Sequence, residues 1–239
     1  MPASVPSTDT RAANMQRRRE RILHEARRLI GALGFNGLTL RHLAEAAGVT
    51  VPTIYNLIGN KDQLLRELNE EMMSHLEARL AARPSESPLE RAEAMISESI
   101  ALFSSDADYY RAALIAADYV EHAMTRDESL GRRSVRLPTD VCRAAQAAGE
   151  LRGAIPAEVL GEQVFRTYRT ACRDWANRRL TLDRFRAKAL LAVYLTLAAD
   201  AVDGFHAVLV GKIARLHREA QESLVTTANT RAVFDTTTS

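Results

Sequence analysis

Apolar residues recur every three or four positions along most of the chain, the spacing that places them on one face of an α-helix. No stretch of useful length alternates apolar and polar residues in the manner of a β-strand. Glycine and proline stand mainly between the periodic stretches, where helices begin or end. The pattern therefore predicts an all-α protein.

Two short helical stretches meet at a glycine in the N-terminal part of the chain. The apolar positions of the first stretch are Leu38, Leu40, Leu43, Ala44 and Ala47. Thr39 is placed to accept a hydrogen bond from a free amide at its start, and Gly48 tolerates the positive φ of a sharp turn. The second stretch follows Thr50, a favourable N-cap, and has Pro52 in its first turn, where a missing N–H costs least.

A helix, a glycine turn and a second short helix form a helix-turn-helix, whose second helix is sized for the major groove of DNA. The second helix turns Ile54, Leu57 and Ile58 to one side and Thr53, Tyr55 and Asn56 to the other. Two helices this short cannot bury a core alone. A preceding amphipathic helix is expected to support them, with its apolar side formed by Ile22, Ala26, Leu29, Ile30 and Leu33.

This part of the chain resembles the N-terminal domain of the tetracycline-repressor (TetR) family of transcription regulators. The matching segments are residues 26–35, 38–50, 53–55 and 61–65, about the first quarter of the chain. The family's recognition helix usually ends in tyrosine, histidine, an aromatic residue and phenylalanine, whereas this chain has Tyr55, Asn56, Leu57 and Ile58. Ile58 can fill the core position of the phenylalanine, and Asn56 replaces a histidine that contacts the DNA backbone.

The resemblance implies a fold and a mode of action. The N-terminal three-helix domain binds double-stranded DNA, and a C-terminal helical bundle binds a ligand and dimerises through its last two long helices. The homodimer places two recognition helices on a palindromic operator, and a small-molecule effector releases it. Repression is the family's usual sign.

The candidate DNA-binding residues lie at the start of the first helix, on the helix-turn-helix and just after it. They are Arg18, Thr39, Arg41, Thr50, Val51, Pro52, Thr53, Tyr55, Asn56 and Lys61. Thr53 and Asn56 can hydrogen-bond to base edges or phosphates, and Val51 can contact a thymine methyl group. The hydroxyl of Tyr55 suits a phosphate, and Lys61 stands at a helix start, where free amides also attract phosphate.

Charge is distributed in agreement with this assignment. Residues 1–61 contain nine Lys and Arg against four Asp and Glu, and residues 62–239 contain 23 against 26. A basic N-terminal part suits a phosphate-facing surface, although a random scatter of charge remains an alternative. Arg18 belongs to an arginine-rich helix start that either reaches phosphates or is simply solvated.

Composition divides the chain into four parts: a disordered arm at 1–15, the helix-turn-helix domain at 16–64, a helical regulatory and dimerisation domain at 65–218, and a disordered tail at 219–239. Pro138 indicates a kink or a break in one body helix. The stretch 185–197 is apolar nearly all round and needs partners on both sides. An identical subunit would cover one side; a central position in a single bundle is the alternative.

Methionines and aromatic residues of the body are candidates for the lining of an effector site, because they suit adaptable apolar pockets. They are Met72, Met73, Leu76, Phe103, Tyr110, Leu114, Met124 and Trp175. A solid core built from the same residues is the alternative. The pattern names no effector beyond a partly apolar small molecule.

Catalytic, metal and membrane motifs are absent from the sequence. It contains no GxSxG, HExxH, GxxxxGK[ST] or GxGxxG pattern, its six histidines are dispersed, and its two cysteines form no CxxC. Residues 1–16 lack the apolar core of a signal peptide, and the most apolar run, 187–202, is too short and too polar to span a bilayer. We therefore expect a cytoplasmic protein that is not an enzyme and has no catalytic residue, metal site, cofactor or membrane partner.

The sequence as a whole favours a ligand-responsive DNA-binding transcription regulator, with repression as its expected sign. Two other classes remain open. One is an architectural DNA-binding protein without an effector, and the other is a helical enzyme or carrier that has kept the DNA-binding head as a relic.

Overall fold

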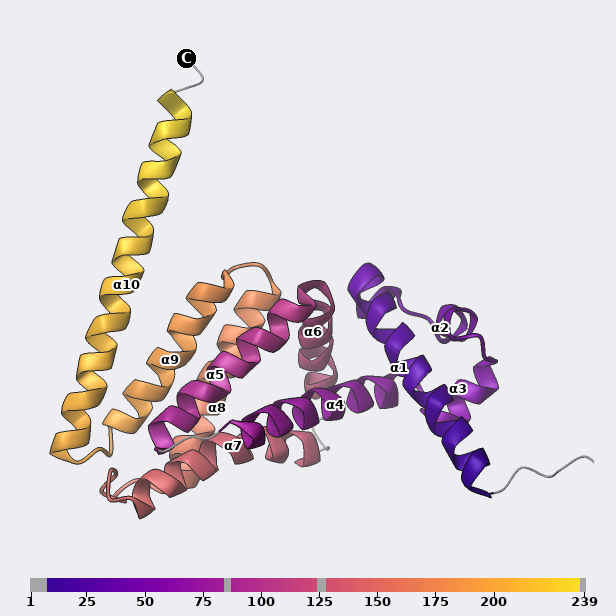
Figure 1. Cartoon of the computed structure of the whole chain (residues 1–239), viewed down its shortest axis with the longest axis horizontal. Helices are drawn as coiled ribbons and strands as arrows, with labels where there is room; N and C mark the ends of the chain where they lie inside the picture. Colours follow the sequence, from indigo (N-terminus) through magenta and orange to yellow (C-terminus); the bar gives the residue numbers. More distant parts are fainter. Residues whose placement is uncertain (1–7, 84–86, 124–127, 237–239) are drawn as a thin grey trace, which may run out of the picture. The chain divides into compact units, whose positions relative to one another are not determined.

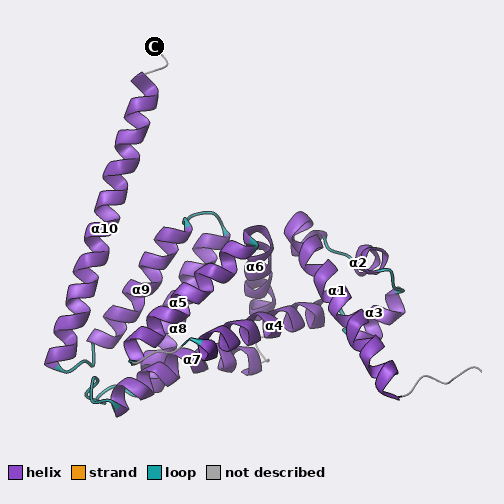
Figure 2. Cartoon of the chain, in the orientation of Figure 1, coloured by secondary structure: helices purple, strands orange, loops and turns teal. Residues whose placement is uncertain are grey.

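In the computed structural model, which describes residues 8–83, 87–123 and 128–236, these residues form ten helices and no strand (Figures 1 and 2). The only paired extended backbone within those ranges is an isolated bridge between Leu151 and Ala201. The all-α prediction is confirmed. The helices group into two compact units, which we describe one at a time.

The first unit takes in residues 1–79 and 101–130. Its described helices are α1 (Thr8–Gly37), α2 (Leu40–Ala47), α3 (Val51–Leu57), α4 (Lys61–Ala82) as far as Arg79, and α6 (Ala107–Ala123). Helix α1 packs against α2 and α3 over a core in which Ile30, Leu43 and Ile54 are fully buried. Helical geometry is interrupted at Gly34, with φ 69° and ψ 165°. Leu33, expected on the buried side, is 51% exposed beside this interruption.

Helix α6 packs closely on α1 within the same unit (Figure 1). A Cβ atom on Gly31 would lie 3.3 Å from the backbone nitrogen of Tyr109, so only a very small residue fits this crossing. Asp106 caps α6, because its Oδ1 accepts a hydrogen bond from the Tyr109 amide at 3.1 Å. Arg27 of α1 donates to both carboxylate oxygens of Glu71 on α4, at 2.6 and 2.7 Å, and ties these two helices together.

The second unit takes in residues 80–100 and 131–239. Its described helices are α5 (Pro88–Ser105) as far as Ile100, α7 (Glu128–Ala147) from Gly131, α8 (Ala157–Ala176), α9 (Leu182–Ala198) and α10 (Asp203–Thr236). Helix α9 packs against both α8 and α10, over fully buried Trp175, Phe185 and Leu197. Helices α7 and α8 approach closely at Gly161, where an added Cβ would lie 2.6 Å from the Cα of Thr139.

A buried aspartate joins two loops of this unit. The side chain of Asp200, only 2% exposed, accepts hydrogen bonds from the amides of Gly153 at 2.9 Å and Ala154 at 3.1 Å. The backbone adds a bond from the Arg152 amide to the Asp200 carbonyl at 2.7 Å and one from the Val202 amide to the Glu150 carbonyl at 3.0 Å. The loop between α7 and α8 is thereby held to the loop between α9 and α10.

Two features of the second unit bear on the alternatives left open by the sequence. Leu195 of α9 is 55% exposed, but Phe185, Leu190 and Val193 on the same helix are buried within the single chain. The packing of α8 and α10 on α9 covers these side chains within the chain, and a second subunit against the exposed Leu195 stays a prediction. Helix α7 passes through Pro138 without a break.

The helices also extend beyond the expected ranges. Helix α1 begins at Thr8, inside the segment 1–15 expected to be a disordered arm, and α10 continues to Thr236, through most of the expected tail at 219–239. The first unit includes residues 65–79 and 101–130, beyond the expected boundary at 64, because α6 packs on α1. No helix in the described ranges is long and apolar enough to cross a membrane.

Candidate nucleic-acid interface

Helix α2 begins at a side-chain cap that the sequence predicts. Thr39 has extended backbone angles, and its hydroxyl accepts a hydrogen bond from the His42 amide at 3.2 Å. Arg41 on the first turn is highly exposed and contacts Glu45 at 3.3 Å, one turn further on. An exposed pair of this kind contributes little to stability, so the guanidinium can leave Glu45 for a phosphate at small cost.

The turn after α2 depends on Gly48. Its φ of 61° and ψ of 41° are left-handed, a conformation that glycine adopts without the steric cost of a Cβ atom. The amides of Gly48 and Val49 donate to the carbonyls of Glu45 and Ala44, at 3.2 and 3.0 Å, and close the end of the helix. These bonds set the direction in which the chain enters α3.

Helix α3 is held by its own cap and by one buried side. Thr50 accepts a bond from the Thr53 amide at 3.4 Å, and the two hydroxyls lie 2.9 Å apart. Ile54 is fully buried and Ile58, just past the helix, is also buried, which confirms that Ile58 fills a core position. With the inner side anchored, the outer side has a fixed orientation.

The outer side of α3 is polar and uncharged. Tyr55 is 56% exposed, Pro52 and Asn56 are exposed, and Val51 and Thr53 are half-buried. Tyr55 and Asn56 offer a hydroxyl and an amide to a partner, and these groups can bond to phosphates or base edges. The hydroxyl of Thr53 is shared with Thr50, so it reaches a base only by exchanging that contact.

Lys61 opens α4 and lies against α1. Its ammonium nitrogen is 4.6 Å from the centre of the Phe35 ring and 3.5 Å from the carbonyl oxygen of Asn36. Partial burial lowers the pKa of Lys61, and neighbouring Asp62 acts in the opposite direction. The side chain is thus positioned beside the helix-turn-helix.

A capping box that we did not infer from the sequence fixes the start of α4. The Gln63 amide donates to the side chain of Asn60 at 2.9 Å, and the Asn60 amide donates to the side chain of Gln63 at 2.8 Å. A glutamine three residues after an N-cap is the sequence signal that could have revealed the reciprocal bond.

The arginine-rich start of α1 divides into bound and exposed side chains. Arg19 forms an ion pair with Glu67 of α4, and Arg17 donates to Asn14 at 2.8 Å. Arg18 and Arg21 are exposed. Arg18 is therefore free to reach a phosphate, and its role in DNA binding stays a prediction.

The residues predicted to line an effector site belong to both units. Met73, Phe103 and Tyr110 are buried in the first unit, and the rings of Phe103 and Tyr110 lie 5.6 Å apart. Met72, Leu76 and Leu114 of the same unit are half-buried. Trp175 belongs to the second unit, and Met124 lies outside the described residues. No group of three or more His, Cys, Asp or Glu suited to a metal ion occurs within the ranges the structure describes.

Comparison with known proteins places the N-terminal segment in a family. Residues 22–68 match the model of the bacterial regulatory proteins of the tetR family; this segment runs from the middle of α1 through α2 and α3 into the first turns of α4. No curated protein matches the chain.

Solved structures share the fold of most of the chain. SmeT, the repressor of the Stenotrophomonas maltophilia multidrug efflux pump SmeDEF, is similar with a TM-score of 0.62 at 20% identity, over 78% of this chain and 92% of that one. FadR from Bacillus subtilis, in complex with stearoyl-CoA, gives 0.61 at 17% identity, over 74% and 97%. A TetR-family transcriptional regulator from Pectobacterium atrosepticum gives 0.63 at 18% identity, over 80% and 97%.

Proposed function

Since residues 22–68 belong to the tetR family of bacterial regulatory proteins and most of the chain has the fold of such regulators, we propose that this protein is a ligand-responsive transcriptional repressor. It binds a palindromic operator in double-stranded DNA as a homodimer, and a small-molecule effector releases it. It catalyses no reaction, and it acts on DNA in the cytoplasm.

The outer face of α3 is the observation that carries this proposal. Its exposed groups are polar and uncharged, and the helix behind them is anchored by the Thr50 cap and by buried Ile54. Asn56 and Thr53 read base edges or bind phosphates, and Val51 contacts a thymine methyl group. Pro52 adds apolar contact at the start of the helix.

The surroundings of α3 supply the sequence-independent contacts. Tyr55, Thr39 and Thr50 present hydroxyls to phosphates, while Arg41, Lys61 and Arg18 present positive charge. Two copies related by a two-fold axis read half-sites one helical turn of DNA apart, about 34 Å.

The effector is a partly apolar small molecule. Stearoyl-CoA in the Bacillus subtilis FadR structure supports this choice, as do the buried Phe103 and Tyr110 on two neighbouring body helices. The ligand releases DNA because it binds the arrangement with mis-spaced heads more tightly and shifts the population toward it.

The test begins with selection of bound DNA from a random pool by the purified full-length chain. The affinity of the winning sequence is then measured against salt concentration for wild type, Asn56→Ala, Tyr55→Phe and Lys61→Ala. Arg28→Ala is the matched control for loss of a positive charge, because Arg28 is exposed on α1, pairs with Glu25 and is not a predicted contact. Circular dichroism of each variant verifies its folding.

We expect the selected DNA sequence to be palindromic and its affinity for the protein to fall steeply with rising salt concentration. Lys61→Ala should weaken binding to all sequences and reduce the salt slope by about 1 for each phosphate that the variant no longer binds. Asn56→Ala should weaken the selected site more than random DNA, whereas Arg28→Ala should leave both unchanged. Failure to enrich any sequence would contradict the proposal and favour the relic-head alternative; enrichment with no effector response and no open site in the body would favour an architectural protein.

A further inference from the structure

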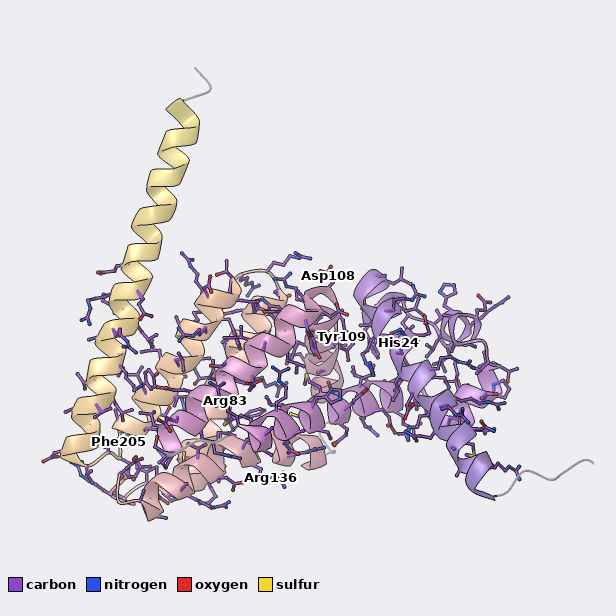
Figure 3. The ribbon with its side chains drawn as sticks, viewed as in Figure 1. His24, Arg83, Asp108, Tyr109, Arg136 and Phe205 are labelled. Carbon is purple, nitrogen blue, oxygen red and sulfur yellow. The ribbon has the colours of Figure 1, made fainter. Side chains whose placement is uncertain are left out.

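The second unit contains a polar cleft that sequence reasoning missed. It lies among α5, α9 and α10, with Arg83 (labelled in Figure 3) at its edge, and has a volume of about 560 Å³. That volume lies within the range of small-molecule sites, about 300–1,000 Å³. Two of its walls are fixed relative to each other because α9 packs directly on α10.

Charged side chains dominate the lining. The basic residues are Arg83, Arg186, Lys212 and Arg215, the acidic residues are Glu90, Glu93 and Glu219, and the apolar residues are Ala94, Leu190 and Leu216. Ordinary ligand pockets are lined mainly by apolar and aromatic side chains. This cleft is therefore suited to a charged, hydrophilic molecule rather than to the apolar effector proposed above.

One carboxylate in the cleft already has two hydrogen-bond donors on one of its oxygens. Glu93 Oε1 accepts hydrogen bonds from the Tyr194 hydroxyl at 2.7 Å and from the Lys212 ammonium at 2.6 Å. The Lys212 nitrogen also lies 5.8 Å from the centre of the Tyr194 ring. These three residues form a cluster that joins α5, α9 and α10, and in it the charge of Glu93 is balanced by that of Lys212.

Of the other cations, Arg83 pairs with Glu98 at 3.2 Å, whereas Arg215 and Arg186 are less engaged. Arg215 reaches Glu219 on its own helix at 3.7 Å, a long and exposed contact that contributes little. Arg186 has no ion-pair partner in the described part of the chain. A guanidinium without a carboxylate partner retains its full capacity for bidentate binding of an anion.

Arg186 and Arg215 both line the cleft, as does Tyr194. Burial and the adjacent Glu93 raise the pKa of the Tyr194 hydroxyl, while the positive charges of Arg186 and Arg215 act in the opposite direction. The two arginines and Tyr194 therefore line one cleft from α9 and α10. An anion bound beside Tyr194 would meet two cations at once.

We propose that this cleft binds a small anion carrying a carboxylate or phosphate group, held by Arg186 and Arg215 beside the Glu93–Tyr194–Lys212 cluster. Glu90 and Glu219 limit the net positive charge of the lining, so the cleft is suited to a small anion rather than to a long polyanion such as nucleic acid. The site is separate from the residues predicted to line the effector pocket, none of which lines this cleft.

Calorimetric titration of the full-length chain with inorganic phosphate, and separately with citrate, tests the proposal. Ionic strength is held constant with chloride, because phosphate salts also stabilise proteins by exclusion from their surface. Arg186→Gln and Arg215→Gln remove the proposed contacts. Arg184→Gln is the matched control, since Arg184 is exposed on the same helix, loses the same charge and does not line the cleft.

We expect saturable binding of one anion per chain, with Kd raised by about tenfold or more in Arg186→Gln and in Arg215→Gln. Tenfold is the change for loss of one charge-assisted hydrogen bond. Arg184→Gln should bind like wild type, and the tighter of the two anions identifies the preferred group. Heats that do not saturate across the millimolar range, or a Kd in Arg186→Gln equal to that of wild type, would overturn the proposal.

Discussion

Replacement of Asp200 tests how the second unit is held together. The carboxylate uses a separate oxygen for each of two backbone amides, from Gly153 and Ala154, and it is almost completely buried. Hydrogen bonds to a charged group contribute about 1.5–3 kcal/mol each, and a buried amide left without an acceptor costs about 1–3 kcal/mol. Asp200→Ala removes both acceptors and should lower the free energy of unfolding by about 3–5 kcal/mol.

Asp200→Asn separates charge from geometry. The asparagine oxygen keeps one acceptor, while its NH₂ group faces the second amide as another donor, so we expect a loss of about 2 kcal/mol. Asp203→Asn is the control. Asp203 pairs with Arg152 at the surface, at 2.8 Å and with a fully exposed side chain, and an exposed pair contributes about 0–1 kcal/mol.

The assay is urea unfolding followed by tryptophan fluorescence. The chain has a single tryptophan, Trp175, which is fully buried in the same unit as Asp200, so the signal reports on that unit. The order of stability should be wild type and Asp203→Asn, then Asp200→Asn, then Asp200→Ala. A loss below about 1 kcal/mol in Asp200→Ala, or one equal to that of Asp203→Asn, would refute the assignment of Asp200 as the link between the two loops.

Three further predictions concern backbone and burial. Gly161→Ala should destabilise the second unit by about 1–3 kcal/mol, because the added Cβ would meet the Thr139 backbone. Gly211→Ala, in open space on α10, should stabilise the unit by about 0.5–1 kcal/mol. Equal urea midpoints for the two variants would contradict this pair of predictions. Arg178 has a φ of 60°, a left-handed conformation that glycine adopts without steric cost. Arg178→Gly should therefore raise the free energy of unfolding by about 1 kcal/mol. A lower thermal midpoint in the variant would show that the arginine side chain compensates for the strain. Burial raises the pKa of the Cys142 thiol from near 9 to about 11, so the folded state favours the protonated thiol. The stability that this preference contributes is present below pH 9 and falls by about 2 kcal/mol as pH rises toward 11. Cys142→Ala should lack this part of the pH dependence. An identical dependence of unfolding free energy on pH in both proteins would rule out the contribution of Cys142.

The helices, their caps and the helix-turn-helix could be predicted because they depend on short-range chemistry. A cap joins groups three residues apart, as in Thr39 with His42, Thr50 with Thr53 and Asn60 with Gln63. The turn at Gly48 depends on the freedom of one residue. The exposed face of α3 follows from helical periodicity once Ile54 is assigned to the core.

Features that depend on distant parts of the chain could not be predicted in this way. The apolar stretch of α9 is compatible with cover from another subunit or from its own, and only the tertiary structure shows that α8 and α10 pack on it within the chain. Leu33 has the right spacing for the core, but the interruption at Gly34 accompanies its exposure.

The division between sequence and tertiary structure follows from the range of the interactions. The sequence by itself determined an all-α chain with a DNA-binding helix-turn-helix, because periodicity, caps and turns act within a few residues of one another. The charged cleft depends on contacts between Glu93 and Tyr194, 101 residues apart, and between Glu93 and Lys212, 119 residues apart. No local sequence pattern predicts which surface charges will meet at such separations in the chain. Only the packing of α5, α9 and α10 brings these three side chains together.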